Sequence, residues 1–279
     1  GQDPATGMDF DVARGHCEAK GAGWHLMTRV EWALLALWCK KNAFLPYGNN
    51  DYGKDSRETN YKAIPTYKDG DGEILRVATG TGPLTWSHDK SPSGIWDLNG
   101  NVAEWVGGMR TVFGELQVLV HNNAADASHS QLVGSSEWMA INGTTGAFIT
   151  PNGSGTTPNS LKLDWVGSVW KWITGAVTYA TGTYQGCLFE SVTVDGSVHA
   201  DAVLLLQALG LYKHDTTSGA YEGDYLYADC TQAERLFCCG GAWHGGAAYG
   251  VFCASGFYPR SLSYTLLGLR CAFVNLPPA

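Results

Sequence analysis

The N-terminal part of the chain repeats its apolar residues with the period of a helix. Before Gly21, a residue type that commonly ends helices, three apolar residues recur at helical spacing: Phe10, Ala13 and Cys17. A second helix is marked by Thr28 and Glu31, which have the spacing of a capping box. The residues expected to line its apolar face are Ala33, Leu34, Leu37 and Trp38. The pattern therefore predicts two helices near the N-terminus.

Beyond these helices the pattern predicts short strands between long loops. Turn-forming residues dominate 42–85, and Gly, Thr, Asn, Pro and Ser dominate 142–160, so both stretches are expected to be loops or wandering hairpins. Strands are expected at 96–98, 102–106 and 116–120. In the last of these, apolar and polar residues alternate, which is typical of a half-buried strand.

A third helix is expected at 200–211, with Asp201 in its first turn. The chain shows no internal repeat and no long linker, and 279 residues suffice for one large domain. The fold class expected is therefore α+β, with one loop-rich domain over 8–279 and a long insertion around 110–230. The opening Gly1-Gln2-Asp3-Pro4 resembles a remnant of an expression vector, and residues 1–7 are expected to be disordered.

Composition narrows the classes of partner. Charged residues make up 16% of the chain, below the usual share of about 25%, while 36 Gly and 11 Trp suit a loop-rich fold with an irregular aromatic interior. The net charge of −8 argues against nucleic acid as a partner, because phosphate binding needs a basic surface. The longest apolar stretch, 202–211, is interrupted by Gln207 and is too short to span a bilayer, so no membrane insertion is expected.

The eight cysteines are too sparse for a disulfide-stapled miniprotein, and no Cys-x-x-Cys pair indicates a zinc site. Buried free thiols are the interpretation that we favour. The eight histidines include no pair at i, i+3 or i, i+4, so ligand pairs on one helix face are missing.

The C-terminal segment 240–273 combines a regular frame with positions of erratic size. The frame reads Gly240-Gly241-Ala242-Trp243, Gly250-Val251-Phe252, Pro259-Arg260-Ser261 and Gly268-Leu269-Arg270-Cys271-Ala272-Phe273. Core positions match the volumes of their neighbours, but here Gly stands beside Phe and Ala beside Tyr without a strand or helix period. We therefore expect a binding surface built from His244, Gly245, Ala248, Tyr249, Ser255, Gly256, Phe257, Tyr258, Leu262, Tyr264, Thr265 and Leu266. Ordinary core packing of the aromatic members is the alternative.

Three segments carry a resemblance to a known fold family. Residues 94–106, Gly-Ile-Trp-Asp-Leu-Asn-Gly-Asn-Val-Ala-Glu-Trp-Val, resemble the central signature of the formylglycine-generating-enzyme type of C-type lectin fold. Gly240-Gly241-Ala242-Trp243 with Gly268-Leu269-Arg270-Cys271 is similar to its closing segment, and 24–32 fits its helical start. The resemblance implies a C-type lectin fold over most of the chain, but function differs among members of that fold.

The enzyme branches of this family fit less well than a binding branch. Members that resemble sulfatase-modifying oxidases hold copper with two thiolates, and the matching positions here are Gly245 and Gly250. An oxygen-dependent modifying enzyme with displaced ligands, such as Cys253, stays open as an alternative. A structural lectin-fold module of a phage tail or surface protein is a further one.

The chain also resembles the variable proteins of diversity-generating retroelements, which use this fold to display a C-terminal segment rewritten by mutagenic reverse transcription. In such systems template adenines, often in Asn codons, are randomised, and every erratic position above, together with Cys253, holds a residue that such a codon can reach. Leu269 departs from the usual Phe. The resemblance implies a non-enzymatic protein, encoded by a phage or bacterium, that docks a protein or cell-surface ligand from a virion or cell surface.

One cofactor is implied by the enzyme branch. There, the equivalents of Asp97 and Glu104, with carbonyls matching Gly100 and Val102, resemble a calcium site of hard oxygen ligands. The alternative, which we favour, is turn hydrogen bonding by Asp97 and a structural ion pair by Glu104. No cofactor other than calcium is expected.

Overall fold

Three helices and a large mixed sheet dominate the computed structural model, which describes residues 1–275. The α-helices in this range are α1 (Phe10–Glu18), α2 (Arg29–Lys41) and α3 (Ala200–Ala208). Short 3-10 turns occur at η1 (Leu84–Trp86), η2 (Val120–Ala125), η3 (Phe189–Ser191) and η4 (Gly246–Ala248). The α+β class expected from the sequence is confirmed.

Helix α1 forms as its pattern predicts. The Asp9 side chain accepts a hydrogen bond from the Val12 N–H and so caps the first turn. Phe10, Ala13 and Cys17 are its buried residues, and the Phe10 ring meets the Trp105 indole edge-on at 6.0 Å. The helix thereby covers one face of strand β4 (Ala103–Val112).

Helix α2 begins at the expected capping box, in which Thr28 and Glu31 cap each other's backbone N–H groups. The predicted apolar face is wrong in part, because Leu34 is 66% and Trp38 40% exposed. The buried face is instead Arg29, Trp32, Ala33, Ala36 and Cys39. Trp32 fixes this orientation: its indole N–H donates to the Val251 carbonyl at 2.8 Å, which ties α2 to the C-terminal segment.

Within residues 1–275 the main sheet has twelve strands. Its continuous path is β10 (Gln185–Leu188), β12 (Tyr225–Ala228), β14 (Ala254–Tyr258), β13 (Arg235–Cys239), β4, β5 (Glu115–Leu119), β8 (Lys162–Val166), β9 (Val169–Ile173) and β11 (Thr193–Val194). Three strands join it from the side: β15 (Leu267–Leu269), β6 (Trp138–Ile141) and β7 (Phe148–Ile149). Separate pairs are β1 (Trp24–Leu26) with β16 (Cys271–Phe273) and β2 (Pro65–Lys68) with β3 (Ile74–Val77).

Two of the expected strands form, and one does not. Strands β4 and β5 cover the predicted segments, whereas 96–98 makes only an isolated bridge between Ser87 and Trp96. Strand β5 is buried on both faces, not on one. Its polar residues satisfy one another there, since Gln117 donates to Glu115 and accepts from Arg110.

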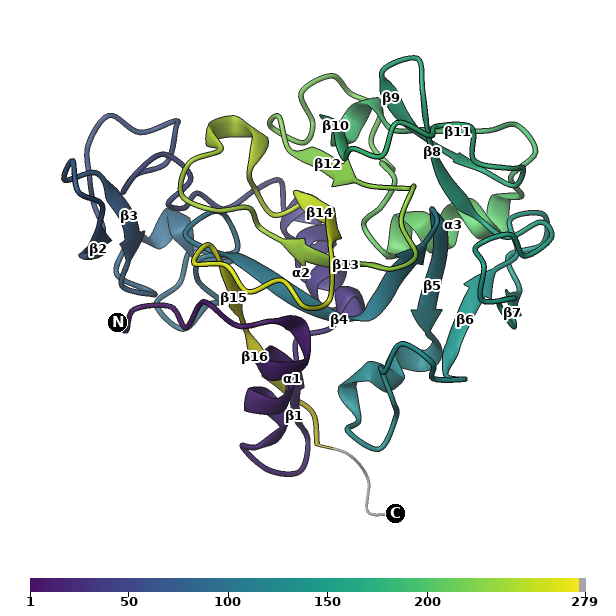
Figure 1. Cartoon of the computed structure of the whole chain (residues 1–279). Helices are drawn as coiled ribbons and strands as arrows, with labels where there is room; N and C mark the ends of the chain where they lie inside the picture. Colours follow the sequence, from purple (N-terminus) through teal and green to yellow (C-terminus); the bar gives the residue numbers. More distant parts are fainter. Residues whose placement is uncertain (276–279) are drawn as a thin grey trace.

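The segment 110–230 belongs to the same sheet as the C-terminal strands (Figure 1). Strand β12 runs parallel to β14, with Tyr227 opposite Ser255. One hydrophobic cluster contains Trp32 from α2, Trp170 from β9 and Phe252 from the C-terminal segment. The insertion therefore extends the central sheet, and its side chains share the main core.

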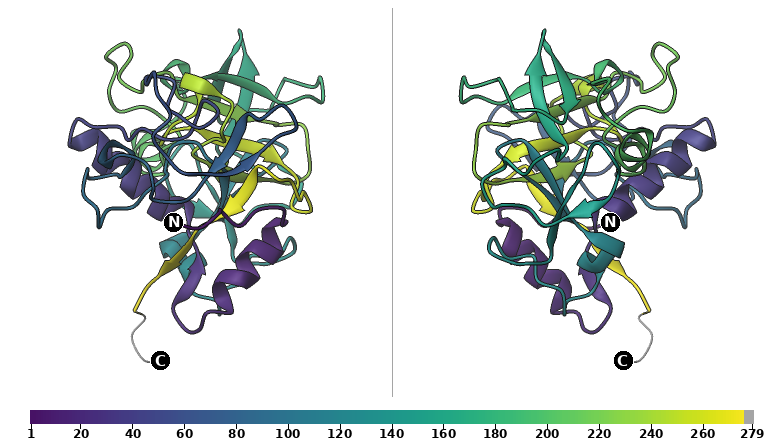
Figure 2. Two further views of the ribbon diagram at one scale, coloured as in Figure 1. Left: turned by 90° about the vertical axis from the view of Figure 1, so that its left-hand side faces the viewer. Right: turned by 90° about the vertical axis from the view of Figure 1, so that its right-hand side faces the viewer.

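The first residues, for which the sequence predicts disorder, contact β3 and the C-terminal part of the chain. Asp3 pairs with Arg76 at 2.9 Å, and the Gly7 N–H donates to the Tyr264 and Leu267 carbonyls. The two side views show α1 and the β1–β16 pair together at one end of the molecule (Figure 2). No helix in the described range 1–275 has the length and apolarity needed to cross a membrane.

Candidate binding surface

Part of the expected frame in the C-terminal segment is buried, whereas Pro259, Ser261 and Phe273 of that frame are exposed. Trp243, Val251 and Phe252 from the expected frame are 7%, 1% and 1% exposed. Among the expected surface positions, His244, Tyr264 and Thr265 are exposed. The half-buried positions are Gly245, Ala248, Tyr249, Phe257, Tyr258, Leu262 and Leu266.

Three of the expected surface residues are buried, which corrects the sequence prediction. Cys253 is fully buried, Gly256 is buried, and Ser255 is 8% exposed. Gly256 faces inward on β14, where an added Cβ would lie 2.4 Å from the Phe237 ring. These positions cannot present side chains to a partner. The alternation of β14 leaves Phe257 as its principal outward aromatic residue.

Rings on and around β14 gather into one cluster, which we call the aromatic cluster: Tyr184, Tyr225, Tyr227, His244, Tyr249, Phe257 and Tyr258. Tyr258 also packs edge-on against the buried Trp105, with ring centroids 6.0 Å apart. The Phe257 ring stacks on Tyr184 with centroids 4.3 Å apart and planes 15° from parallel, and it meets Tyr258 at 4.1 Å. The Phe257 ring also contacts the Tyr227 ring, which in turn contacts the rings of Tyr249 and Tyr225. His244 completes the chain of contacts, with its ring 5.6 Å from Tyr249.

The sequence prediction missed the three members that come from the insertion. Tyr184 immediately precedes β10 and is 55% exposed, while Tyr225 and Tyr227 alternate with the buried Leu226 and Ala228 along β12. That alternation is a visible sequence signal of a strand with one outward aromatic face. What the sequence could not show is that β12 pairs with β14, which brings Tyr227 within 6.4 Å of Phe257.

Two glycines, Gly241 and Gly245, make room for the Tyr249 ring. An added Cβ at Gly241 would lie 2.1 Å from the Tyr249 ring, and one at Gly245 would lie 2.2 Å from it. The ring therefore lies against both backbone segments. The residue type at 245, one of the expected variable positions, thus controls where the ring at 249 can lie.

Asp224 fixes the turn behind the cluster. Its carboxylate accepts a hydrogen bond from the Phe252 N–H at 2.7 Å and lies so close to Gly250 that a Cβ there would be 2.1 Å from Oδ1. Burial raises the pKa of Asp224 to about 8. A side chain at 250 has no room, which explains the glycine at this frame position.

Arginines anchor the frame to the rest of the fold. Arg260 donates to Glu234, Asp11 and the Gln131 carbonyl, and so ties the end of β14 to three other elements. Arg110 reaches Glu234 from β4 at 2.8 Å. The backbone under the aromatic cluster is therefore fixed by contacts that leave the outward side chains free to differ.

At the conditional calcium site, an arginine already pairs with one of the two carboxylates. Both oxygens of the Glu104 carboxylate accept hydrogen bonds from Arg270, at 2.7 and 2.6 Å. The same guanidinium donates to the Trp96 and Asp97 carbonyls. The Asp97 side chain accepts from the Gly80 N–H. Glu104 thus forms the structural ion pair, and Asp97 the turn hydrogen bond, of the interpretation that we favoured, while the second Asp97 oxygen, Oδ1, is buried without a hydrogen-bond partner.

The remaining expected positions lie away from the aromatic cluster. Leu262 and Leu266 pack against the core beneath α1, and Leu266 also contacts the cluster around Trp243. Tyr264 and Thr265 form an exposed turn next to Gly7. Among the described residues, no aromatic contact joins Tyr264 to the other rings.

The aromatic cluster offers tyrosine hydroxyl groups as hydrogen-bond donors and acceptors. Burial raises the pKa of the Tyr227, Tyr249 and Tyr258 hydroxyl groups above the ordinary value of about 10, at which they are already protonated near neutral pH. No group of three or more His, Cys, Asp or Glu side chains that could hold a metal occurs in residues 1–275. No protein-family model matches the chain, and a comparison with curated proteins finds no match.

Proposed function

We propose that this protein is a non-enzymatic ligand-binding protein with the C-type lectin fold of the formylglycine-generating-enzyme type, whose C-terminal surface is diversified by a retroelement. The observation that carries the proposal is that 243–266 combines a buried part of the frame with neighbouring positions that are half-buried or exposed. Phe252 is sealed in the core, whereas Phe257, five residues later, stacks on an exposed tyrosine. Side chains at these outward positions can change without changing the core.

The proposed ligand is a protein or another cell-surface molecule, and the proposed setting is a virion or cell surface. Tyrosines among small residues favour this kind of partner, because they give rigid contact area at low entropic cost while small neighbours permit close approach. Tyr249 between Gly241 and Gly245 is such an arrangement. Affinity would come from the rings and specificity from their combination.

The alternative of an oxygen-dependent enzyme that uses Cys253 has less support. The Cys253 thiol is fully buried, and burial raises its pKa well above the usual value, which disfavours the thiolate that binds copper. A structural module of a phage tail would have the same frame, but its outward positions would not need to tolerate substitution.

Tolerance to substitution distinguishes these functions without a known ligand. One displayed library randomises five outward positions: His244, Ala248, Tyr249, Phe257 and Tyr264. A matched library randomises five buried positions of the same segment: Trp243, Val251, Phe252, Ala254 and Leu267. We expect most members of the first library, and few of the second, to resist proteolysis as folded proteins do.

Equal fractions of protease-resistant members in the two libraries would contradict the proposal.

The genomic flank gives an independent test of diversification. We expect a reverse transcriptase gene and a near-copy of the 3′ end of the coding sequence, with Asn codons at the outward positions. A flank with neither feature would leave a binding fold without the proposed mechanism of variation.

A further inference from the structure

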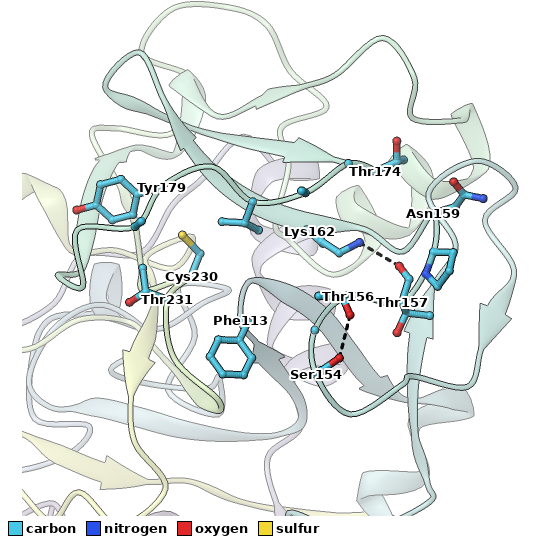
Figure 3. A pocket seen from close by; sticks show the side chains of 16 residues that line it. Phe113, Ser154, Thr156, Thr157, Asn159, Lys162, Thr174, Tyr179, Cys230 and Thr231 are labelled. Carbon is cyan, nitrogen blue, oxygen red and sulfur yellow. Dashed lines mark hydrogen bonds between the residues drawn. The ribbon is translucent and has the colours of Figure 1, made fainter.

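A second candidate site lies inside the insertion and shares no lining residue with the aromatic cluster. It is a cleft of about 720 Å³ between two loops, 154–159 and 174–180, next to the β4–β5 turn at Phe113 (Figure 3). Cys230 and Thr231 close its inner end. We propose that this cleft binds a small organic carboxylate with a planar apolar body.

The negative charge of the proposed ligand follows from Lys162, the one charged side chain that lines the cleft in the described part of the chain. Lys162 is 5% exposed, and its ammonium donates to the main-chain carbonyls of Thr157 and Ser160 at 3.1 and 3.2 Å. Both acceptors are neutral. A third N–H therefore has capacity for a ligand oxygen.

The nearest carboxylate does not form an ion pair with this lysine. Glu115 stands opposite Lys162 in the β5–β8 pairing, but no ion pair within 4.0 Å joins them among the described residues. Its oxygens instead accept from the Thr157 N–H, the Ser160 hydroxyl and the Gln117 amide. Glu115 also contributes nothing to the lining, so the charge that the cleft presents is positive.

The planar apolar body follows from the walls. Phe113 is 41% exposed although it is a large apolar side chain, and Tyr179 contributes a second ring on the same side of Lys162 (Figure 3). Val177 and Pro158 add aliphatic surface. A cleft with mostly apolar walls and one placed charge is the usual form of a small-molecule site, and its volume is in the usual range.

Both rims are fixed in place without a ligand. The loop 174–180 is held by Asp164, whose carboxylate accepts from the Thr178 N–H and hydroxyl and from the Tyr179 N–H. The other rim is closed by the Thr157 hydroxyl, which accepts from the Asn152 N–H. Gly155 has φ +71°, and a Cβ there would lie 2.3 Å from the Val112 carbonyl oxygen, so this rim packs directly on the β4–β5 hairpin. A preformed cleft loses little entropy on binding.

Amide chemical-shift titration of the whole chain tests the proposal with indole-3-acetate as the probe. Indole-3-acetamide supplies the same body without the charge, and glucuronate supplies the charge without the apolar body. We expect indole-3-acetate to shift the amides of Gly155, Thr157, Val177 and Cys230, and the other two compounds to bind about tenfold more weakly or less.

Two variants locate the site, and a third is the control. Lys162→Met should weaken indole-3-acetate binding about tenfold or more, and Ala176→Trp at the exposed rim should block the cleft without touching the core. Lys171→Met, which removes a half-exposed lysine paired with Asp195 just after strand β11, should leave indole-3-acetate binding unchanged. If Lys162→Met fails to fold, the comparison of acid with amide and the Ala176→Trp variant still decide. Equal binding of acid and amide, preference for glucuronate, unchanged binding in Ala176→Trp, or no shifts at all would overturn the proposal.

Discussion

At the scale of single residues, the outward positions are coupled to the frame through glycine. The Tyr249 ring lies where Cβ atoms of residues 241 and 245 would otherwise be. Gly241 also has φ +70°, a left-handed conformation that favours glycine, whereas Gly245 has φ −93°, which any residue adopts. Glycine at 241 is therefore required both by the backbone conformation and by the lack of room for a side chain. Glycine at 245 is favoured only by the lack of room. This difference matches their expected roles as frame and variable position.

The coupling between 245 and 249 predicts a non-additive pair of substitutions. Gly245→Ala should destabilise the protein by about 1–2 kcal/mol, because the new methyl group displaces the Tyr249 ring. In a Tyr249→Ala background the same change should cost almost nothing, since the ring is gone. Urea unfolding of the four proteins measures the coupling. Additive effects would show that the ring moves aside freely.

Two phenylalanines on one segment form a matched pair. Phe252→Ala should cost about 3–5 kcal/mol of unfolding free energy, because it opens a cavity among Phe189, Tyr221 and the rest of the main core. Phe257→Ala removes a ring that stacks on an exposed tyrosine, and should cost about 1 kcal/mol or less. Thermal or urea unfolding measures both. Similar losses would place Phe257 in the core and remove the main support for a binding surface.

At the scale of elements, the surface depends on the junction between β12 and the turn at 250–252. Asp224, one residue before β12, accepts a hydrogen bond from the Phe252 N–H and packs against Gly250. Strand β12 then continues parallel to β14. The junction therefore sets the register that brings Tyr227 beside Phe257.

The pKa of Asp224 gives this junction a pH dependence. Its folded-state pKa of about 8 lies above the ordinary value of 3.8, so between these pH values the folded protein holds a proton that the unfolded chain has lost. Stability should consequently fall as pH rises from about 4 to about 8, by a few kcal/mol from this group. Asp224→Asn lacks the titration. The melting temperature of the wild type should therefore decline relative to the variant across that window, and a constant difference would contradict the assignment.

The sequence predicted elements better than their pairing. The cap of α2 is local, because Thr28 and Glu31 are three residues apart, and the sequence predicted it. The sequence did not predict the buried face of α2, because it is decided by Arg29 and Trp32 binding carbonyls about 180 and 219 residues away. Likewise, Phe257 was predicted, whereas its stacking partner Tyr184 lies in a different segment of the sheet.

At the scale of the whole molecule, the insertion and the C-terminal segment form one structure. The sheet runs without interruption from β10 through β14 and β4 to β11, and the main core includes side chains from both parts. The aromatic cluster therefore has a half that the proposed diversification would rewrite and a half that it would leave constant. Tyr184, Tyr225 and Tyr227 are the constant half.

The distribution of thiols tests this architecture and the enzyme alternative together. Seven of the eight cysteines are buried, and Cys271 is half-buried against Cys17 in the cluster beneath α1. Burial also raises the pKa of Cys39, Cys230 and Cys253, so their thiolates are scarce at neutral pH. Native protein should thus react with Ellman's reagent at one thiol at most on the timescale of minutes, and all eight should react in guanidinium. Cys271→Ser should abolish the native reaction, while Cys253→Ser should leave it unchanged.

The opposite result would be a fast-reacting thiol that disappears in Cys253→Ser. Such a thiol would show that Cys253 is accessible and reactive, as a thiolate-based oxidase requires and a binding scaffold does not.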